Sequence, residues 1–217
     1  MIRNLLFDMD GVLIDSEPLH FRIWRDIFRQ RGLELAYEDY LLCVGSNMES
    51  LFGMAKGASP VTMEERPGLI EIFRKEKDIW LREHGVPTIP GVRETVEELH
   101  RRGYHMAVAS SSAPRYIELC IGLLGIRSCF EQLCSGYSVA HPKPAPDIFL
   151  AAAASLGARP EECLVIEDSR NGCLAAQAAG MECWGFRNLH SGMQDLSTAA
   201  WIFEDFTALS DRLPELN

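Results

Sequence analysis

The stretch NLLFDMDGVLIDS, residues 4–16, decides the fold. A short apolar run is followed at once by two carboxylates, Asp8 and Asp10, and then by Gly11, a residue type that can adopt backbone angles that others avoid. This pattern predicts a strand that ends in a chemical site. In an open parallel sheet, ligands bind beyond the carboxyl ends of the strands, which is where both carboxylates would lie.

After this strand the pattern becomes helical. Ser16 is placed to cap a helix that carries Pro18 in its first turn, where the missing N–H costs nothing. Apolar residues at helical spacing indicate a second long amphipathic helix around residues 72–80, and we expect no strand before about Gly85. The large aromatic residues of this segment are expected in its core rather than on a sugar-stacking surface: Trp24, Phe28, Phe73 and Trp80.

The breaker cluster PTIPG at residues 87–91 marks a return to the main domain, where strands and helices alternate. Such alternation is typical of a parallel sheet with right-handed crossovers, so the predicted fold class is a doubly wound α/β sheet with an inserted all-helical cap. The predicted domains are a core formed by residues 1–14 and 88–217 and a cap formed by residues 15–87. The predicted core helices are 92–102, 114–124, 147–156 and 169–179, and the strands after the first are 105–109, 163–167, 182–186 and 201–203.

Polar side chains with related chemistry stand at or near the ends of the predicted strands. These are Asp8 and Asp10, Ser110, Lys143, and Glu167 with Asp168. They are the residue types that phosphoryl transfer through an aspartyl phosphate requires, with Asp8 as the nucleophile and Asp10 as the general acid and base. Because carboxylate and phosphate repel each other, such a site needs a divalent cation, and Mg²⁺ fits hard oxygen ligands.

Residues 4–16 resemble the first motif of the haloacid dehalogenase superfamily, and DGVLIDS resembles its branch of sugar-phosphate phosphatases and beta-phosphoglucomutase. Three further family motifs follow in the expected order, including PKPAPD around Lys143, and the resemblance covers nearly the whole chain. It implies a Mg²⁺-dependent phosphatase that hydrolyses a small phosphorylated metabolite, a sugar or sugar-acid phosphate, through an aspartyl phosphate on Asp8.

The resemblance also implies individual roles. The implied metal ligands are Asp8, the backbone carbonyl of Asp10, Asp168 and Glu167, the last either directly or through water. The implied phosphate-binding residues are Ser110, Ser111 and Lys143. Taken singly, the serines would suit a polar loop, Lys143 a surface position and Glu167-Asp168-Ser169 a helix cap. Their joint occurrence in order favours the functional interpretation.

The cap is less informative. His20 stands where the resembling mutase has a histidine facing the active site, although a surface or interdomain histidine is an equal alternative. Gly45-Ser46-Asn47 suits either a loop that dips toward the substrate or a simple turn. Family members that hold a second phosphate carry a lysine and an arginine around this loop. Residues 43–49, CVGSNME, contain neither, and Glu49 would repel a second phosphate.

Hydrolysis is therefore favoured over the alternative of a phosphosugar mutase, although Lys75 or Lys77 would supply the missing cation if either reached inward. Dehalogenation has no use for Asp10 or for a metal. A non-catalytic binding protein on this fold is disfavoured because all four site motifs are present.

Composition excludes other classes. The chain has 217 residues, 47% of them hydrophobic, and a formal net charge of −10 without a basic stripe, which disfavours nucleic acid and anionic membranes as partners. The 7 cysteines form no Cys-x-x-Cys pair and suit buried or half-buried thiols in a reducing compartment. No signal peptide or membrane span is predicted. We expect a cytoplasmic monomer or weak homo-oligomer whose partner is a small phosphate ester.

Overall fold

The structure, a computed structural model, describes residues 2–44 and 48–214, with the backbone alone at residues 48 and 49. Its centre is a six-stranded parallel sheet in the order β5-β4-β1-β6-β7-β8. The chain extends the sheet from β1 to one side and then to the other, so β1 is the switch point of a doubly wound sheet. The strands are β1 Asn4–Phe7, β4 His105–Ser110, β5 Gln132–Ser135, β6 Cys163–Glu167, β7 Glu182–Phe186 and β8 Trp201–Phe203.

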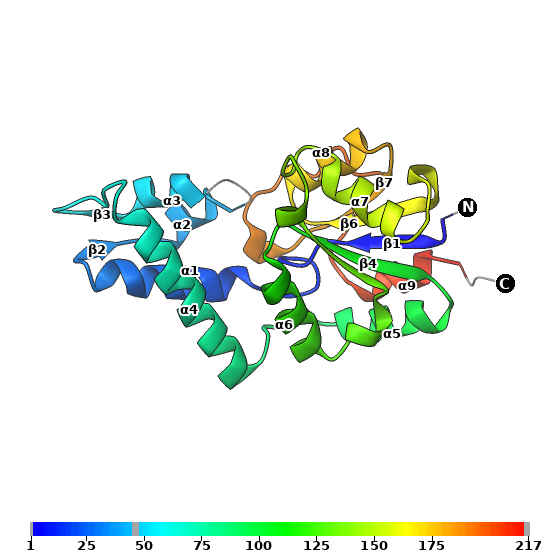
Figure 1. The fold of residues 1–217 in the computed structure, drawn as a ribbon, viewed down its shortest axis with the longest axis horizontal. Coiled ribbons are helices and arrows are strands. Elements are labelled where there is room, and N and C mark those ends of the chain that lie inside the picture. Colours follow the sequence, from blue (N-terminus) through cyan, green and yellow to red (C-terminus); the bar gives the residue numbers. More distant parts are fainter. Residues whose placement is uncertain (1, 45–47, 215–217) are drawn as a thin grey trace.

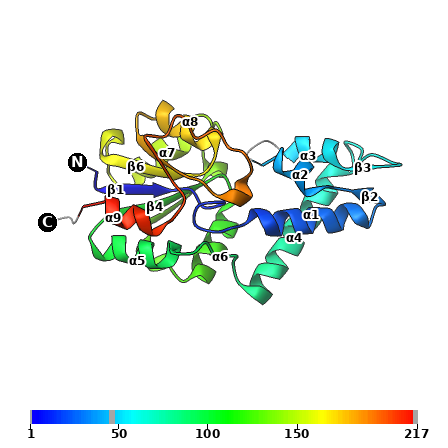
Figure 2. The same cartoon turned by 180° about the vertical axis from the view of Figure 1, so that it is seen from behind.

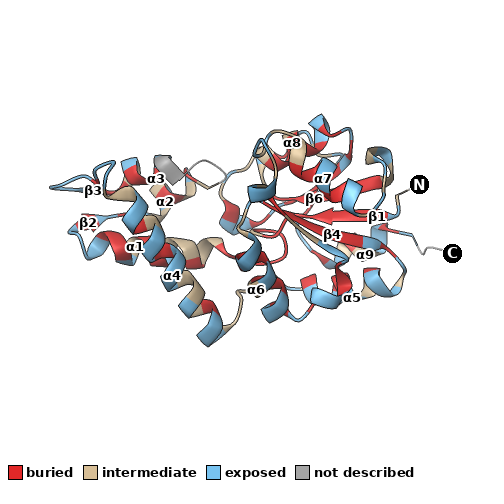
Figure 3. Ribbon diagram, in the orientation of Figure 1, coloured by how far each residue is buried: buried red, intermediate tan, exposed pale blue. Residues whose placement is uncertain are grey.

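Helices cover both faces of the sheet, α7 and α8 on one face and α5, α6 and α9 on the other (Figure 1). Side chains alternate along β1, so Leu6 packs in the cluster under α7 and α8 while Leu5 and Phe7 pack with the opposite helices. The buried strands thus lie between two layers whose outer faces are exposed (Figure 3). The helices are α5 Val92–Arg101, α6 Pro114–Leu124, α7 Asp147–Ser155, α8 Arg170–Ala178 and α9 Thr207–Arg212, with 3₁₀ turns at Arg127–Cys129, Gly136–Ser138, Pro160–Glu162 and Leu189–Ser191.

The inserted segment forms a separate layer beside one end of the sheet (Figures 1 and 2). Its helices are α1 Glu17–Arg29, α2 Tyr37–Leu41, α3 Met48–Met54 and α4 Arg66–His84. Trp24 lies face to face with Phe73 at 4.7 Å between ring centroids, and Phe28 and Phe52 pack around Trp24. Trp24, Phe28 and Phe73 are therefore core residues, whereas Trp80 is only half-buried.

The two connections between the cap and the core lie side by side. The backbone N–H of Asp15 donates to the carbonyl of Pro87 at 2.9 Å, and Ile14 pairs with Thr88. These contacts lie next to the boundaries that the sequence suggested, although the division into two domains at those residues remains a prediction.

Three expectations about local structure were wrong. The cap contains a short antiparallel pair, β2 Leu33–Glu34 and β3 Lys56–Gly57, where no strand was expected. Two-residue strands are too short to show an alternating pattern. Ser16 does not cap α1, because its hydroxyl has no hydrogen-bond partner in the described residues and its backbone is already helical. The edge strand β5 was missed, since QLCS carries no apolar run.

Two further features concern the chain as a whole. Among the described helices, none is long and apolar enough to cross a membrane. No two of the 7 cysteines, all of which lie in the described residues, form a disulfide, and 6 of them are buried.

Candidate active site

Side chains from distant parts of the chain meet at the carboxyl end of the sheet. Asp8 follows β1, Ser110 ends β4, Glu167 ends β6 and Lys143 comes from the connection between β5 and α7. They line one cavity of about 500 Å³. The predicted residues around it are Asp8, Asp10, Ser110, Ser111, Lys143, Glu167 and Asp168. The structure brings these residues together as expected, and the roles assigned to them remain predictions.

Lys143 is the electrostatic centre of the cavity. Its ammonium donates to Asp8 Oδ1 at 2.5 Å, to Glu167 Oε1 at 2.8 Å and to the carbonyl of Ala109 at 3.1 Å. Its side chain is 7% exposed, so it is not the solvated surface lysine of the plainer interpretation. Burial disfavours the charge, but Asp8 and Glu167 outweigh burial and raise the pKa of Lys143 above its usual value.

The acidic groups around Lys143 are crowded. Burial raises the pKa of Asp8 to about 7; Lys143 acts in the opposite direction, and the neighbouring Glu167 raises it further. Burial, followed by the charges of Glu167 and Asp8, also raises the pKa of Asp168 well above its ordinary value. One ammonium therefore faces more carboxylates than it can neutralise, which is an arrangement that a bound cation would relieve.

The donor set fits Mg²⁺ better than a metal held entirely by protein. Within residues 2–44 and 48–214, no group of three or more His, Cys, Asp or Glu side chains is arranged as a metal site. Mg²⁺ needs only one or two carboxylates and keeps several waters or phosphate oxygens. Both oxygens of Glu167 are engaged, one by Lys143 and the other by the N–H and hydroxyl of Ser169. Asp8 and Asp168 are thus the better direct ligands, and Glu167 suits binding through water.

Gly11 fixes how closely Asp168 approaches the loop after β1. Its φ of +87° lies in the left-handed region, as its position in the sequence suggested. A Cβ atom at this residue would lie 2.0 Å from Asp168 Oδ2 and 2.8 Å from Ser191 Oγ. The hydroxyl of Ser191 donates to the same Asp168 oxygen. Asp168 is therefore held between the backbone of Gly11, which carries no side chain, and the hydroxyl of Ser191.

Asp10 is oriented by residues that the sequence did not single out for this task. Ser112 Oγ donates to Asp10 Oδ2 at 2.8 Å, and the Tyr116 hydroxyl lies 3.5 Å from Asp10 Oδ1. The backbone N–H of Ser112 donates to Ser110 Oγ at 3.1 Å. The place of Ser112 two residues beyond the end of β4 was a usable signal, whereas nothing in the sequence distinguished Tyr116 or Ser191.

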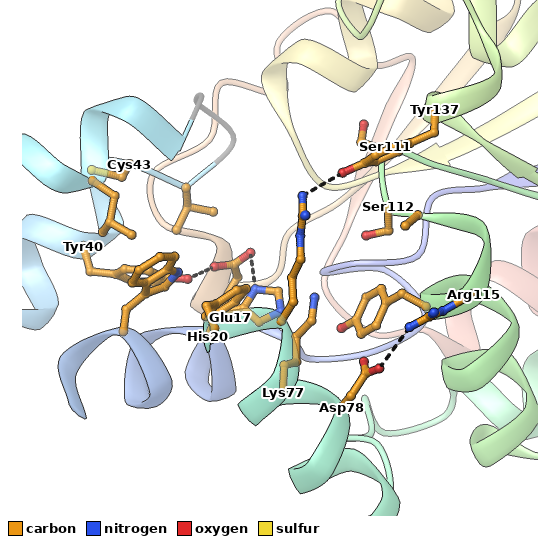
Figure 4. Close-up of a pocket in the computed structure, with 17 residues that line it drawn as sticks. Glu17, His20, Tyr40, Cys43, Lys77, Asp78, Ser111, Ser112, Arg115 and Tyr137 are labelled. Atoms are coloured by element: carbon orange, nitrogen blue, oxygen red, sulfur yellow. Dashed lines mark hydrogen bonds and ion pairs between the residues drawn. The ribbon is translucent and has the colours of Figure 1, made fainter. Parts of the chain in front are cut away.

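A second cavity of about 360 Å³ lies between the cap and the core (Figure 4). His20 lines it and is not a surface histidine: its Nε2 is buried and has no hydrogen-bond partner among the described residues. Glu17 lines both cavities and accepts a hydrogen bond from Tyr40. The two cavities therefore adjoin each other and share lining residues such as Glu17 and Ser111.

Lys77 is the inward cation that the sequence left open. It lines the second cavity, with Nζ 3.4 Å from the centroid of the Tyr116 ring, whereas Lys75 is exposed. Burial lowers the pKa of Lys77. No carboxylate of the described residues lies within 4.0 Å of its ammonium. Residues 45–47, for which the sequence left open a substrate loop or a simple turn, and the side chain of Glu49 lie outside the described part of the chain.

Most of the chain matches one known protein family. Residues 2–180 match the haloacid dehalogenase-like hydrolase family. The chain is 37% identical over 189 residues to Protein SUPPRESSOR OF QUENCHING 1, chloroplastic, of Arabidopsis thaliana, an alignment that covers 84% of this chain but only 17% of that protein. It is 33% identical to Hexitol phosphatase B of Escherichia coli (strain K12) over 177 residues, which cover 81% of this chain and 79% of that protein.

A solved structure agrees with the sequence relatives. CbbY from Rhodobacter sphaeroides in complex with phosphate superimposes with a TM-score of 0.83 and 26% identity, covering 96% of each chain. The structural superposition and the family match indicate the same family. This chain belongs to the haloacid dehalogenase-like hydrolase family.

Proposed function

We propose that this chain is a Mg²⁺-dependent phosphatase that hydrolyses a sugar phosphate or sugar-acid phosphate through an aspartyl phosphate on Asp8. The observation that carries the proposal is the buried ammonium of Lys143, which donates to both Asp8 and Glu167 at the carboxyl end of the sheet. The relative named hexitol phosphatase and the phosphate-bound CbbY structure support the same substrate class.

Two displacements at phosphorus make up the reaction. Asp8 attacks the phosphorus and the bond to the leaving-group oxygen breaks, while Asp10 gives its proton to that oxygen. Asp10 then takes a proton from water as the water attacks the phosphorus. The bond to Asp8 breaks, which releases inorganic phosphate and restores both carboxyl groups.

The surrounding residues hold the charges of this reaction. Lys143 stabilises Asp8 and the phosphate oxygens together, Ser110 donates to a phosphate oxygen, and Ser112 keeps Asp10 turned toward the leaving group. Asp8, Asp168 and the backbone carbonyl of Asp10 would hold Mg²⁺. When bound, the ion supplies positive charge that lets the phosphate approach the carboxylates.

The second cavity would take the leaving group. Two nitrogen groups without a hydrogen-bond partner in the described residues line it, His20 Nε2 and the Lys77 ammonium. Unpartnered polar nitrogens of this kind favour a leaving group rich in hydroxyl or anionic oxygen, as a sugar or sugar acid is. Lys77 also keeps a phosphosugar mutase as the second candidate, since a cation in this cavity would suit a second phosphate.

Phosphorus NMR separates these possibilities. The protein is incubated with Mg²⁺ and a panel of sugar phosphates that includes beta-glucose 1-phosphate, with and without a chelator, and Asp8→Asn serves as the inactive control. Chelator-sensitive release of inorganic phosphate, absent in the variant, is expected. Conversion of beta-glucose 1-phosphate to glucose 6-phosphate without net release would instead identify a mutase. Phosphate release by Asp8→Asn would refute Asp8 as the nucleophile.

A further inference from the structure

The loop after β7 reaches from the core to the cap. In Figures 1 and 2 this orange segment, with the 3₁₀ turn Leu189–Ser191, lies between the sheet and the cap helices. Gln194 of this loop lines the same cavity as Lys143, together with Val44 of the cap. The loop is thus in contact with the site and with the cap at once.

The carboxamide of Gln194 joins three segments. Its Nε2 donates to the carbonyl of Val44 at 3.0 Å and to the carbonyl of Ser191 at 3.0 Å. Its Oε1 accepts from the backbone N–H of Arg170 at 3.2 Å. Both N–H groups and the oxygen are therefore engaged, which fixes the orientation of the amide. The hydrogen bond to Val44 thus reaches further into the cap than the loop's other side-chain hydrogen bonds to the cap segment, which end at Asp15.

Close backbone packing supports this contact. Gly192 has a φ of +71°, and a Cβ atom there would lie 2.9 Å from the carbonyl oxygen of Leu41, the last residue of α2. No other residue type fits between the loop and the cap without a shift. The end of α2 is thus seated directly on the loop.

The same loop holds the candidate metal ligand and the start of the cap. Ser191 donates to Asp168, Asn188 donates to the carbonyl of Gly11 at 3.0 Å, and His190 Nδ1 lies 2.7 Å from Asp15 Oδ2. A displacement of the loop would therefore move Asp168 and the cap contact together.

We propose that Gln194 is a positioning residue that couples docking of the cap to Mg²⁺ binding at Asp168. The inference rests on the proposed function only in taking Asp168 as a metal ligand. Such coupling is reciprocal: if bound Mg²⁺ strengthens cap docking, loss of the docking contact weakens Mg²⁺ binding by the same factor.

Hydrogen exchange and calorimetry test the coupling without relying on turnover. Amide exchange in the peptide 37–44 is measured with and without Mg²⁺, and Mg²⁺ affinity is measured by titration calorimetry. The variants are Gln194→Leu, which removes the amide, and Gln194→Glu, which places a carboxylate against two carbonyl oxygens. Asp195→Asn is the matched control, because Asp195 is exposed and its carboxylate accepts hydrogen bonds from Ser197 within the same loop.

In the wild type and in Asp195→Asn, Mg²⁺ is expected to slow exchange in this peptide. In both Gln194 variants we expect that protection to disappear and the Mg²⁺ dissociation constant to rise about fivefold or more, the usual range for coupled sites. Unchanged protection and affinity in folded Gln194 variants would overturn the coupling and leave the phosphatase proposal intact. A wild type that binds no Mg²⁺ would overturn both.

Discussion

Replacing Gly11 by alanine tests how the loop after β1 builds the proposed metal site. The added Cβ would lie 2.0 Å from Asp168 Oδ2, so this oxygen would have to move about 1.4 Å to reach the ordinary contact distance of 3.4 Å. The left-handed backbone, with φ +87°, adds about 1–2 kcal/mol of strain for a residue with a side chain. The substitution thus combines a backbone cost with a displaced carboxylate.

Gly103 separates these two effects. Its φ of +86° almost equals that of Gly11, but no atom lies within 4 Å of the position its Cβ would take. Both alanine variants should lose the same 1–2 kcal/mol of backbone stability, or roughly 2–8 °C in Tm for a chain of this size. Only Gly11→Ala should also weaken Mg²⁺ binding, by about 10- to 100-fold, since even a shift of a ligand's support has that effect.

Thermal unfolding and titration calorimetry with Mg²⁺ provide the two readouts. Equal affinity for Mg²⁺ in Gly11→Ala and Gly103→Ala would refute the assignment of Asp168 as a ligand held against the bare backbone. A loss of Mg²⁺ affinity in both variants would mean that backbone strain alone weakens Mg²⁺ binding.

Three other perturbations probe separate parts of the molecule. Ser112→Ala removes a 2.8 Å hydrogen bond to Asp10 and should slow hydrolysis of sugar phosphates about 10-fold or more while sparing p-nitrophenyl phosphate, whose leaving group needs no acid; equal losses on both substrates would contradict this. Burial lowers the pKa of Lys77, so binding of substrates with an anionic leaving group should weaken as pH rises, at a pH below the usual 10.5 of a lysine. KM measured against pH should show this, and Lys77→Met should lack the dependence. Phe28→Ala should cost about 3–5 kcal/mol in urea unfolding, because Phe28 is 0% exposed in the cap core; a loss under 1 kcal/mol would contradict that packing.

The sequence predicted what depends on short-range pattern. The apolar runs before Asp8 and at Cys163–Glu167 identified central strands, and the polar residue after each run identified a site residue. The edge strand β5 was not predictable in this way, because an edge position needs no continuous apolar run. β5 is defined instead by its parallel pairing with β4.

The supporting residues of the site escaped prediction for a related reason. Ser191, Gln194 and Tyr116 act from loop and helix positions whose directions depend on how distant segments pack. Ser16 shows the converse: a residue typical of a helix cap had its hydroxyl buried without a partner in the described residues, because the chain was already helical there. Local propensity yields to tertiary context at such positions.

The two ends of the inserted segment, Asp15 and Pro87, lie next to each other, and this determines how the fold tolerates insertions of different length. The backbone N–H of Asp15 donates to the carbonyl of Pro87 at 2.9 Å and Ile14 pairs with Thr88, so the inserted segment is a closed loop whose two ends meet beside the sheet. The entropy of closing such a loop grows only logarithmically with its length. The length of the inserted segment should therefore have little effect on the stability of the core through chain entropy, so insertions of different length can be accommodated at this junction.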